Sequence, residues 1–372
     1  MLELQGKYAS ARVFSDRAED YALAQVRQLL DHPALAGSRV RVMPDVHPGR
    51  IGPVGFTATV KDRVMPGVVG VDIGCGITAA KLRGGRVEYG KLDAVIREAV
   101  PAGPRTRRTP HRFRERFDFA RLRCGAHIDR ERAAVSLGTL GGGNHFIELD
   151  RDEAGGLYVV IHSGSRRLGK EVADHYLKAG QKSLKAVGVD VPYELSWLEG
   201  GLLEDYLSDV SAAADFAALN REAILDSLCK GMKWKVTDLW SCVHNYVDTG
   251  GGEAVLRKGA ISAGKGERVI IPINMRDGVL IGTGKGHPDW NESAPHGAGR
   301  VLDRAAVRER YTVSQFRKAV EGVYSPSVGK ETLDEAPFAY RGIEEILAAV
   351  AETVTIEQTL KPVYNFKAGG DD

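Results

Sequence analysis

The sequence predicts a mixed α/β protein of the α+β type, with β-sheets flanked by helices. Three observations predict this class. Apolar residues recur at helical spacing in several segments, short β-branched runs lie between those segments, and the two kinds of segment alternate irregularly across long glycine-rich connections. A regularly wound βαβ protein would show evenly spaced strands and helices, which this chain lacks.

The elements expected follow from these patterns. An amphipathic helix is expected over residues 18–30, where apolar side chains recur every three or four positions. Strands are expected where β-branched and other apolar residues run together, over residues 39–43, 67–73, 157–161, 269–273 and 278–281. Further helices are expected over residues 171–184, 210–229 and 343–353.

The length of 372 residues alone favours two domains. However, no Pro/Ser-rich linker divides the chain, and the candidate ligands described below run from residue 72 to beyond residue 290. Because these ligands must converge, we expect one unit over residues 1–372 with a central cleft. A hydrophobic content of 43% is enough for a sizeable core, and a net charge of +2 does not indicate a partner.

The four cysteines, Cys75, Cys124, Cys229 and Cys242, form no C-x-x-C pair and are too few to hold so long a chain together by disulfides. They indicate a reducing compartment. The first residues lack the apolar core of a signal peptide, and no run of 18 apolar residues could span a membrane. We therefore expect a cytoplasmic protein without a membrane partner.

Residues 105–132 contain ten arginines and four acidic residues, with Phe113, Phe117 and Phe119 among them. Such a segment can bind a polyanion such as RNA. The alternative is a solvated helix face held by salt bridges, which is the commoner origin of charge runs.

Three short segments combine glycines with side chains that bind divalent metals. Their sequences are GVDIGCG at residues 70–76, GGGNHFIE at 141–148 and HSGSR at 162–166. Glycine allows a backbone to approach an ion or a phosphate closely. The spacings are too long for a zinc finger, so the segments favour a catalytic metal centre.

The candidate ligands are Asp72, Cys75, His145, His162 and His244. Each has a structural alternative: an aspartate can cap a turn, a cysteine is often a small buried hydrophobe, and a histidine can be hydrogen-bonded in the core. Together they offer oxygen, sulfur and nitrogen donors, and a thiolate can bridge two ions. Two ions that clamp phosphate oxygens are a common arrangement for phosphoryl transfer. Cysteine favours zinc, whereas the carboxylate also permits manganese.

A further segment, SAPHGAGR at residues 293–300, contains a candidate nucleophile. The neutral imidazole of His296 could attack phosphorus and form a phosphoramidate. Arg300 could hold phosphate oxygens with two hydrogen bonds. Alternatively, these residues form only a tight turn.

In this order, the segments resemble the RtcB family of RNA ligases. Further matches are MPDVH at residues 43–47, RKGA at 257–260 and NFK at 365–367, so the resemblance covers most of the chain. It implies the RtcB-type fold and a ligase that depends on GTP and manganese. Such a ligase joins RNA ends bearing a 3′-phosphate or 2′,3′-cyclic phosphate to 5′-hydroxyl ends. The implied partner is RNA with broken ends, such as tRNA or rRNA, and a helper protein is left open.

Carried over by position, the resemblance implies that Cys75 bridges two manganese ions. His145 and His162 would complete the ligands of one ion, and Asp72 and His244 those of the other, with zinc as an alternative in one site. His296 matches the guanylylated histidine of the family. The residues that match contacts to the guanine nucleotide are Asn144, Phe146, Glu148, Tyr340 and Lys367, and those that match phosphate-holding arginines are Arg166 and Arg300.

The chain departs from the common family pattern at residues 273–278, where INMRDG replaces Gly-Ser-Met-Gly, and it is short for the family. In these features it is similar to a divergent bacterial branch associated with RNA repair. Two other functions remain open from the residues. One is a two-metal RNA phosphodiesterase or nuclease, which would need no adduct on His296. The other is a non-catalytic paralogue that binds RNA ends.

Overall fold

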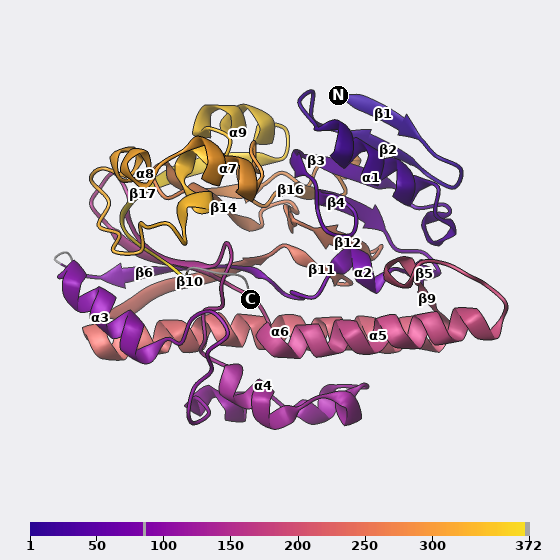
Figure 1. Cartoon of the computed structure of the whole chain (residues 1–372), viewed down its shortest axis with the longest axis horizontal. Coiled ribbons are helices and arrows are strands. Elements are labelled where there is room, and N and C mark those ends of the chain that lie inside the picture. Colours follow the sequence, from indigo (N-terminus) through magenta and orange to yellow (C-terminus); the bar gives the residue numbers. More distant parts are fainter. Residues whose placement is uncertain (85–86, 369–372) are drawn as a thin grey trace.

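The computed structural model describes residues 1–84 and 87–368 and confirms the mixed α/β class. Figure 1 shows two β-sheets at the centre of the molecule, with the long helices α5 (Arg166–Ala186) and α6 (Gly200–Met232) beneath them. Three shorter helices gather on the opposite side: α7 (Arg304–Arg310), α8 (Val313–Ala319) and α9 (Ile343–Val350). The N-terminal strands and α1 (Asp20–Leu30) lie at one end.

The larger sheet has seven antiparallel strands in the order β10-β6-β8-β7-β17-β15-β14. Its strands are β6 (Gly76–Arg83), β7 (Phe146–Arg151), β8 (Leu157–Ser163), β10 (Lys235–Val243), β14 (Arg268–Asn274), β15 (Gly278–Gly284) and β17 (Val354–Lys367). Both faces are covered: one packs Ile161 against Leu228 of α6, and the other packs Val160 in a cluster with Ile346 of α9. Double coverage explains why every residue of β8 is buried and why its sequence is apolar from Leu157 to Ile161.

The second sheet has six strands in the order β1-β2-β3-β4-β12-β11, and only the β2–β3 pair is parallel. Its strands are β1 (Leu2–Gln5), β2 (Ser10–Val13), β3 (Val40–His47), β4 (Val54–Thr59), β11 (Asn245–Asp248) and β12 (Val255–Lys258). Strand β10 of the first sheet ends at Val243 and β11 of the second begins at Asn245. His244 therefore lies at the junction of the two sheets.

Smaller elements connect these layers. Two short ladders pair β5 (Arg63–Val64) with β9 (Leu198–Glu199) and β13 (Ala260–Ser262) with β16 (Ser293–Pro295). The remaining α-helices are α2 (Pro66–Val69), α3 (Tyr89–Ala99) and α4 (Arg130–Ser136). Single 3₁₀ turns are η1 (Pro33–Leu35), η2 (Arg112–Arg116), η3 (Phe119–Arg121), η4 (Gly125–His127), η5 (Tyr193–Leu195), η6 (Pro288–Trp290), η7 (Leu333–Glu335) and η8 (Pro337–Ala339).

Most expected elements are present at the expected places. The helix predicted over residues 18–30 is α1, and the three later helix predictions correspond to α5, α6 and α9. Four of the five expected strands correspond to β3, β8, β14 and β15. The strand expected over residues 67–73 is wrong: the segment forms the short helix α2 and a turn. Pro66 presets the first helical turn, and Gly70, at φ 88°, ends it in a conformation that a strand cannot continue.

The arginine-rich segment, residues 105–132, packs along α6. Phe117 and Phe119 are buried, and both contact Phe216 of α6. Four of its arginines form ion pairs with acidic side chains of α6. These pairs are Arg112 with Asp226 at 2.6 Å, Arg116 with Glu222 at 2.7 Å, Arg121 with Asp215 at 2.7 Å and Arg123 with Asp205 at 3.9 Å. The structure thus supports the salt-bridge interpretation for these arginines.

None of the helices within the described residues combines the length and the apolar character needed to cross a membrane.

Candidate metal and nucleotide site

The five candidate ligands converge at the ends of strands. Cys75 directly precedes β6, His145 directly precedes β7, and His162 is near the end of β8. The Sγ atom of Cys75 lies 3.4 Å from Nε2 of His145 and 3.2 Å from Nε2 of His162. Nε2 of His145 lies 3.1 Å from Oδ2 of Asp72, and Nε2 of His162 lies 3.4 Å from Nε2 of His244. The structure therefore brings all five side chains together.

The ligand atoms fall into two groups, each within 4.8 Å: Cys75 with His162 and His244, and Asp72 with Cys75 and His145. Cys75 belongs to both groups, as expected of a bridging ligand. The expected division of the other four is wrong, because it placed His145 with His162 and Asp72 with His244. In the structure the His145 imidazole faces the carboxylate, and His162 faces His244 across the sheet junction.

Backbone carbonyls orient two of the imidazoles. Nδ1 of His145 lies 2.9 Å from the Leu140 carbonyl oxygen, and Nδ1 of His162 lies 3.2 Å from that of Asn144. A carbonyl can only accept, so each Nδ1 carries a proton, and Nε2 is the nitrogen that each ring turns toward the cluster. Nδ1 of His244 is buried without a hydrogen-bond partner among the described residues.

The electrostatics of the cluster favour a bound cation. Burial first, and neighbouring histidine charges second, lower the pKa values of His162 and His244 well below the usual value, so both are neutral. Burial acts to raise the pKa of Asp72, but the hydrogen bond and charge of His145 outweigh it and lower the pKa to about 2. Burial and the Asp72 carboxylate raise the pKa of Cys75 well above its usual value. The thiol would therefore release its proton when a metal binds, and the donor set fits one or two divalent ions.

Glycine is required at two positions of the predicted segments. A Cβ atom at Gly164 would lie 1.9 Å from Oδ1 of Asp72, and one at Gly141 would lie 2.0 Å from Nη1 of Arg166. Gly141 also has φ 87°, which L side chains rarely adopt. Both glycines therefore make room for functional side chains.

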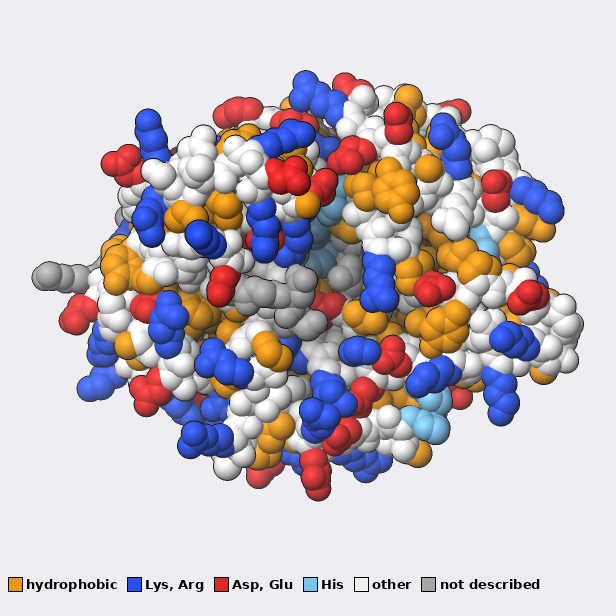
Figure 2. Space-filling view, viewed as in Figure 1, with side chains coloured by type: hydrophobic (Ala, Val, Ile, Leu, Met, Phe, Trp, Pro, Cys, Tyr) orange, Lys and Arg blue, Asp and Glu red, His pale blue; other side chains and the backbone are white. Residues whose placement is uncertain are grey.

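A cavity of about 690 Å³ adjoins the candidate metal ligands, since His162 and His244 line it. Figure 2 shows histidine side chains at the bottom of a hollow in this face, with Lys and Arg side chains around it. Predicted site residues that line the cavity are Asn144, Phe146, Glu148, His296, Arg300, Tyr340 and Lys367. Arg166 is not among the lining residues. Its guanidinium lies against Gly141, and Nη2 donates to the Gly103 carbonyl oxygen at 3.4 Å.

The candidate nucleophile is held by a residue to which sequence analysis gave no role. Nδ1 of His296 lies 2.7 Å from Oδ2 of Asp45, a fully buried aspartate in β3. The His296 ring centroid is 4.9 Å from that of His244, one of the candidate metal ligands. With Nδ1 engaged, Nε2 is the nitrogen that can attack a substrate. The one sequence feature that could have pointed to Asp45 is its position in the MPDVH segment at residues 43–47, which matches the family pattern.

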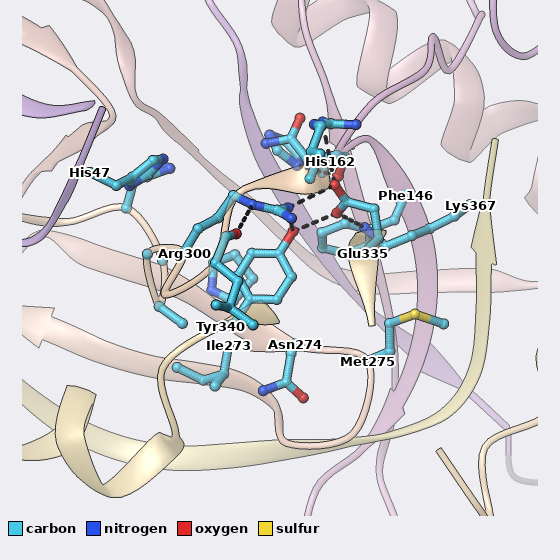
Figure 3. Close-up of a pocket in the computed structure, with 18 of the residues that line it drawn as sticks. His47, Phe146, His162, Ile273, Asn274, Met275, Arg300, Glu335, Tyr340 and Lys367 are labelled. Atoms are coloured by element: carbon cyan, nitrogen blue, oxygen red, sulfur yellow. Dashed lines mark hydrogen bonds and ion pairs between the residues drawn. The ribbon is translucent and has the colours of Figure 1, made fainter. Parts of the chain in front are cut away.

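Glu335, to which sequence analysis also gave no role, holds together the side chains of another wall of the cavity. It accepts hydrogen bonds from Lys367 Nζ at 2.9 Å, Arg300 Nη1 at 3.2 Å and the Tyr340 hydroxyl at 2.5 Å, and Figure 3 shows these side chains converging on it. Burial acts to raise the pKa of Glu335, but the charges of Lys367 and Arg300 outweigh it and lower the pKa. Arg300 also donates to the Asp334 carbonyl oxygen at 2.6 Å, so protein groups hold its guanidinium in place.

The divergent segment at residues 273–278 forms a turn beside the cavity. The Asn274 side chain accepts from the backbone N–H groups of Arg276 and Asp277, which is typical of an Asx turn. Ile273, Asn274 and Met275 line the cavity (Figure 3). The departure noted in the sequence therefore changes the cavity wall itself.

Comparisons with known proteins identify the family. The family model described as tRNA-splicing ligase RtcB matches residues 25–123 and 111–368. The chain is 31% identical to RNA-splicing ligase RtcB of Escherichia coli K12, over 88% of this chain and 90% of that protein. It is 30% identical to tRNA-splicing ligase RtcB of Nanoarchaeum equitans, over 93% and 91% of the two chains. It is also similar, at 28% identity over 95% and 93%, to RNA-splicing ligase RtcB2 of Escherichia coli ATCC 25922. Because the family model matches most of its length and relatives at 31% identity cover 88% of it, this chain belongs to the RtcB family.

Proposed function

We propose that this protein is an RNA ligase that joins a 3′-phosphate or 2′,3′-cyclic phosphate RNA end to a 5′-hydroxyl end through a guanylylated His296. One observation carries the proposal: His296 is oriented by Asp45 and lies beside the candidate metal ligands, at the edge of a cavity large enough for a nucleotide. A nuclease that uses the same ligands would need no such oriented nucleophile.

The reaction has three steps. Nε2 of His296 attacks the α-phosphorus of GTP, a nitrogen–phosphorus bond forms, and pyrophosphate leaves. The RNA 3′-phosphate, which a cyclic end yields when water cleaves its bond from phosphorus to the 2′-oxygen, then attacks the same phosphorus and takes the GMP from the histidine. Finally, the 5′-hydroxyl oxygen attacks the activated 3′-phosphate, the phosphodiester forms and GMP leaves. Asp45 keeps the Nδ1 proton in place and compensates the positive charge that develops on the ring as Nε2 bonds to phosphorus.

Asp72, Cys75, His145, His162 and His244 would hold two metal ions, which we propose are manganese, with zinc as an alternative in one site. Bound there, the ions would stabilise negative charge on phosphate oxygens during transfer.

The guanine nucleotide would occupy the 690 Å³ cavity. Glu148 would accept hydrogen bonds from the guanine edge, and Lys367 and Tyr340 would border the base on the Glu335 side. Asn144 and Phe146 would contact the nucleotide near the metals. We propose that Arg300 positions the cavity wall around Glu335, and that Arg166 acts on the other side, next to Asp72. From these places each arginine could approach a phosphate group.

Several relatives are named as tRNA-splicing or RNA-splicing ligases, and we propose broken tRNA or rRNA as the substrate of this chain. We propose that the protein acts in the cytoplasm. RNA repair can take place there, and the reducing conditions would keep the Cys75 thiol reduced.

The test is incubation of the purified protein with α-labelled GTP and manganese. We expect a covalent label that is lost in acid and stable in alkali, as for a phosphoramidate, followed by sealing of RNA with 3′-phosphate and 5′-hydroxyl ends. Cleavage of RNA without a labelled protein would indicate the phosphodiesterase. RNA-end binding with neither label nor cleavage would indicate a non-catalytic paralogue.

A further inference from the structure

Behind Glu148 the structure holds a second carboxyl group, that of Asp150, which none of the steps above uses. Both residues are on β7, where side chains two positions apart face the same side of the sheet. Glu148 is 3% exposed and Asp150 is fully buried. Glu148 lines the cavity, whereas Asp150 does not.

The two carboxyl groups have different surroundings. Oε2 of Glu148 accepts a hydrogen bond of 2.6 Å from Nδ2 of Asn365, which lies opposite it on β17. Opposite Asp150 the same strand has Pro362, at a point where the register of the ladder shifts. Neither side-chain oxygen of Asp150 has a hydrogen-bond partner among the described residues.

A buried carboxylate without donors is costly, so such a group is protonated or paired with a cation. The charged group that acts on Asp150 is Glu148, which has the same sign. Lys367 on β17 acts on Glu148 and is itself paired with Glu335 on η7. The residues of β8 opposite this face of β7 are Tyr158, Val160 and His162. The Tyr158 hydroxyl donates to Asp152, and His162 belongs to the metal cluster.

We propose that Asp150 is a positioning residue for base recognition: it remains a neutral carboxylic acid and donates its O–H hydrogen to Glu148, so that Glu148 meets the base as an oriented carboxylate. The inference rests on the proposed function, because it assumes that Glu148 contacts the guanine edge. Burial and the Glu148 charge raise the pKa of Asp150 well above its usual value, in keeping with the protonated form. Burial raises the pKa of Glu148 to about 7, while the hydrogen bond from Asn365, the proposed one from Asp150 and the charge of Lys367 act to lower it.

The arrangement has a consequence for nucleotide choice. Asn365 and Asp150 would donate hydrogen bonds to Glu148 from the side away from the cavity. The remaining lone pairs of the Glu148 carboxylate could then accept hydrogen bonds from a nucleotide in the cavity. A carboxylate there accepts the N1–H and N2–H groups of guanine, whereas the corresponding edge of adenine has an unprotonated N1. Loss of the Asp150 donor should therefore weaken GTP binding and reduce its preference over ATP.

Infrared spectroscopy tests the proton directly and does not require activity. At about pH 9, where Glu148 is ionised, we expect the C=O band of a protonated carboxylic acid in the wild type and its loss in Asp150→Asn. Asp209→Asn is the matched control, since Asp209 is equally buried but accepts from the Tyr176 hydroxyl and the backbone N–H groups of Arg123 and Cys124. A band that survives Asp150→Asn unchanged would overturn the proposal.

The kinetic test compares Asp150→Ala with Asp150→Asn, whose amide retains a donor of similar shape. In guanylylation, Asp150→Ala should raise the KM for GTP about tenfold with little change in kcat, the usual effect of losing a hydrogen bond to a charged group. Asp150→Asn should remain close to the wild type. KM should also rise as the pH falls through about 7, because Glu148 becomes protonated, and Asp150→Ala should move this rise to higher pH.

A merely structural role would lower thermal stability without moving the pH profile, and that result would overturn the proposal. If the wild type neither binds GTP nor becomes labelled, the proposed function fails. The infrared result still decides whether Asp150 is protonated, so the two failures are distinguishable.

Discussion

His296 and Asp45 lie 251 positions apart in the chain, yet Nδ1 of the histidine is 2.7 Å from Oδ2 of the aspartate. The aspartate comes from β3 of the six-stranded sheet, and the histidine directly follows β16. The pair gives the candidate nucleophile a defined orientation beside His244.

Asp45→Asn should slow guanylylation of His296 about 100-fold. This is the lower end of the rate loss that follows removal of a group taking part in general acid–base catalysis. The amide preserves the shape of the side chain but not the negative charge that compensates the developing imidazolium. Single-turnover labelling with α-labelled GTP measures the rate of guanylylation. His296→Ala is the negative control: it should bind metal normally but acquire no label. A rate equal to that of the wild type would mean that Asp45 has only a structural role.

Cys75→Ala should lose metal from both ligand groups, because its Sγ atom belongs to both. Cys124→Ala, Cys229→Ala and Cys242→Ala are the matched controls, since none of these cysteines is part of either group within the described residues. Elemental analysis of the purified variants gives the metal content per chain. Equal metal content in all four variants would refute the bridging role.

Metal affinity should increase with pH by about tenfold per unit through the neutral range, because binding releases about one proton. The proton comes from Cys75, whose pKa is raised well above the usual thiol value, whereas Asp72 is already ionised and His162 and His244 are already neutral. Calorimetric titrations in buffers with different ionisation enthalpies count the released protons. An affinity independent of pH would show that Cys75 is not bound as a thiolate.

Glu335→Gln should lower the free energy of unfolding by about 3 kcal/mol, because Lys367 and Arg300 would lose a buried partner. The folded pKa of Glu335 is below its unfolded value, so this contribution is present above about pH 4.3 and is lost as the pH falls through the folded pKa. Urea unfolding at neutral pH measures the change. Glu344→Gln, on the exposed side of α9, is the control and should be neutral.

Replacing Arg112 and Arg121 with alanine should leave the KM for RNA and its salt dependence unchanged, because both arginines are paired with α6. Thermal stability should fall slightly. Arg107→Ala should destabilise the fold more, since Arg107 donates to the carbonyl oxygens of Ala99 and Gly138. If RNA binding by the double variant depended less steeply on salt concentration, residues 105–132 would be an RNA-binding surface after all.

Four of the five candidate ligands could be recognised from short glycine-rich motifs of unusual composition, whereas His244 lies in a segment, CVHN at residues 242–245, that has no glycine. Four helices (α1, α5, α6 and α9) and four strands (β3, β8, β14 and β15) could be predicted, because a buried stripe imposes its period on the sequence. The other described helices and strands were not predicted. The strand expected over residues 67–73 was not formed, because Pro66 and Gly70 outweighed the β-branched residues between them. Strand β17 was not predicted, since Pro362 and polar residues interrupt its apolar pattern and only its pairing with β7 and β15 defines it.

By itself, the sequence determined the fold class, the five candidate ligands and the candidate nucleophile, because these depend on residue type and local pattern. Only the tertiary structure decided which ligands share a group, that Asp45 orients His296, that Glu335 joins Lys367 to Arg300 and Tyr340, and that Asp150 is buried behind Glu148. These relations depend on distances between residues on different strands and turns. Such distances are set by sheet order and register, and no local pattern in the chain specifies them.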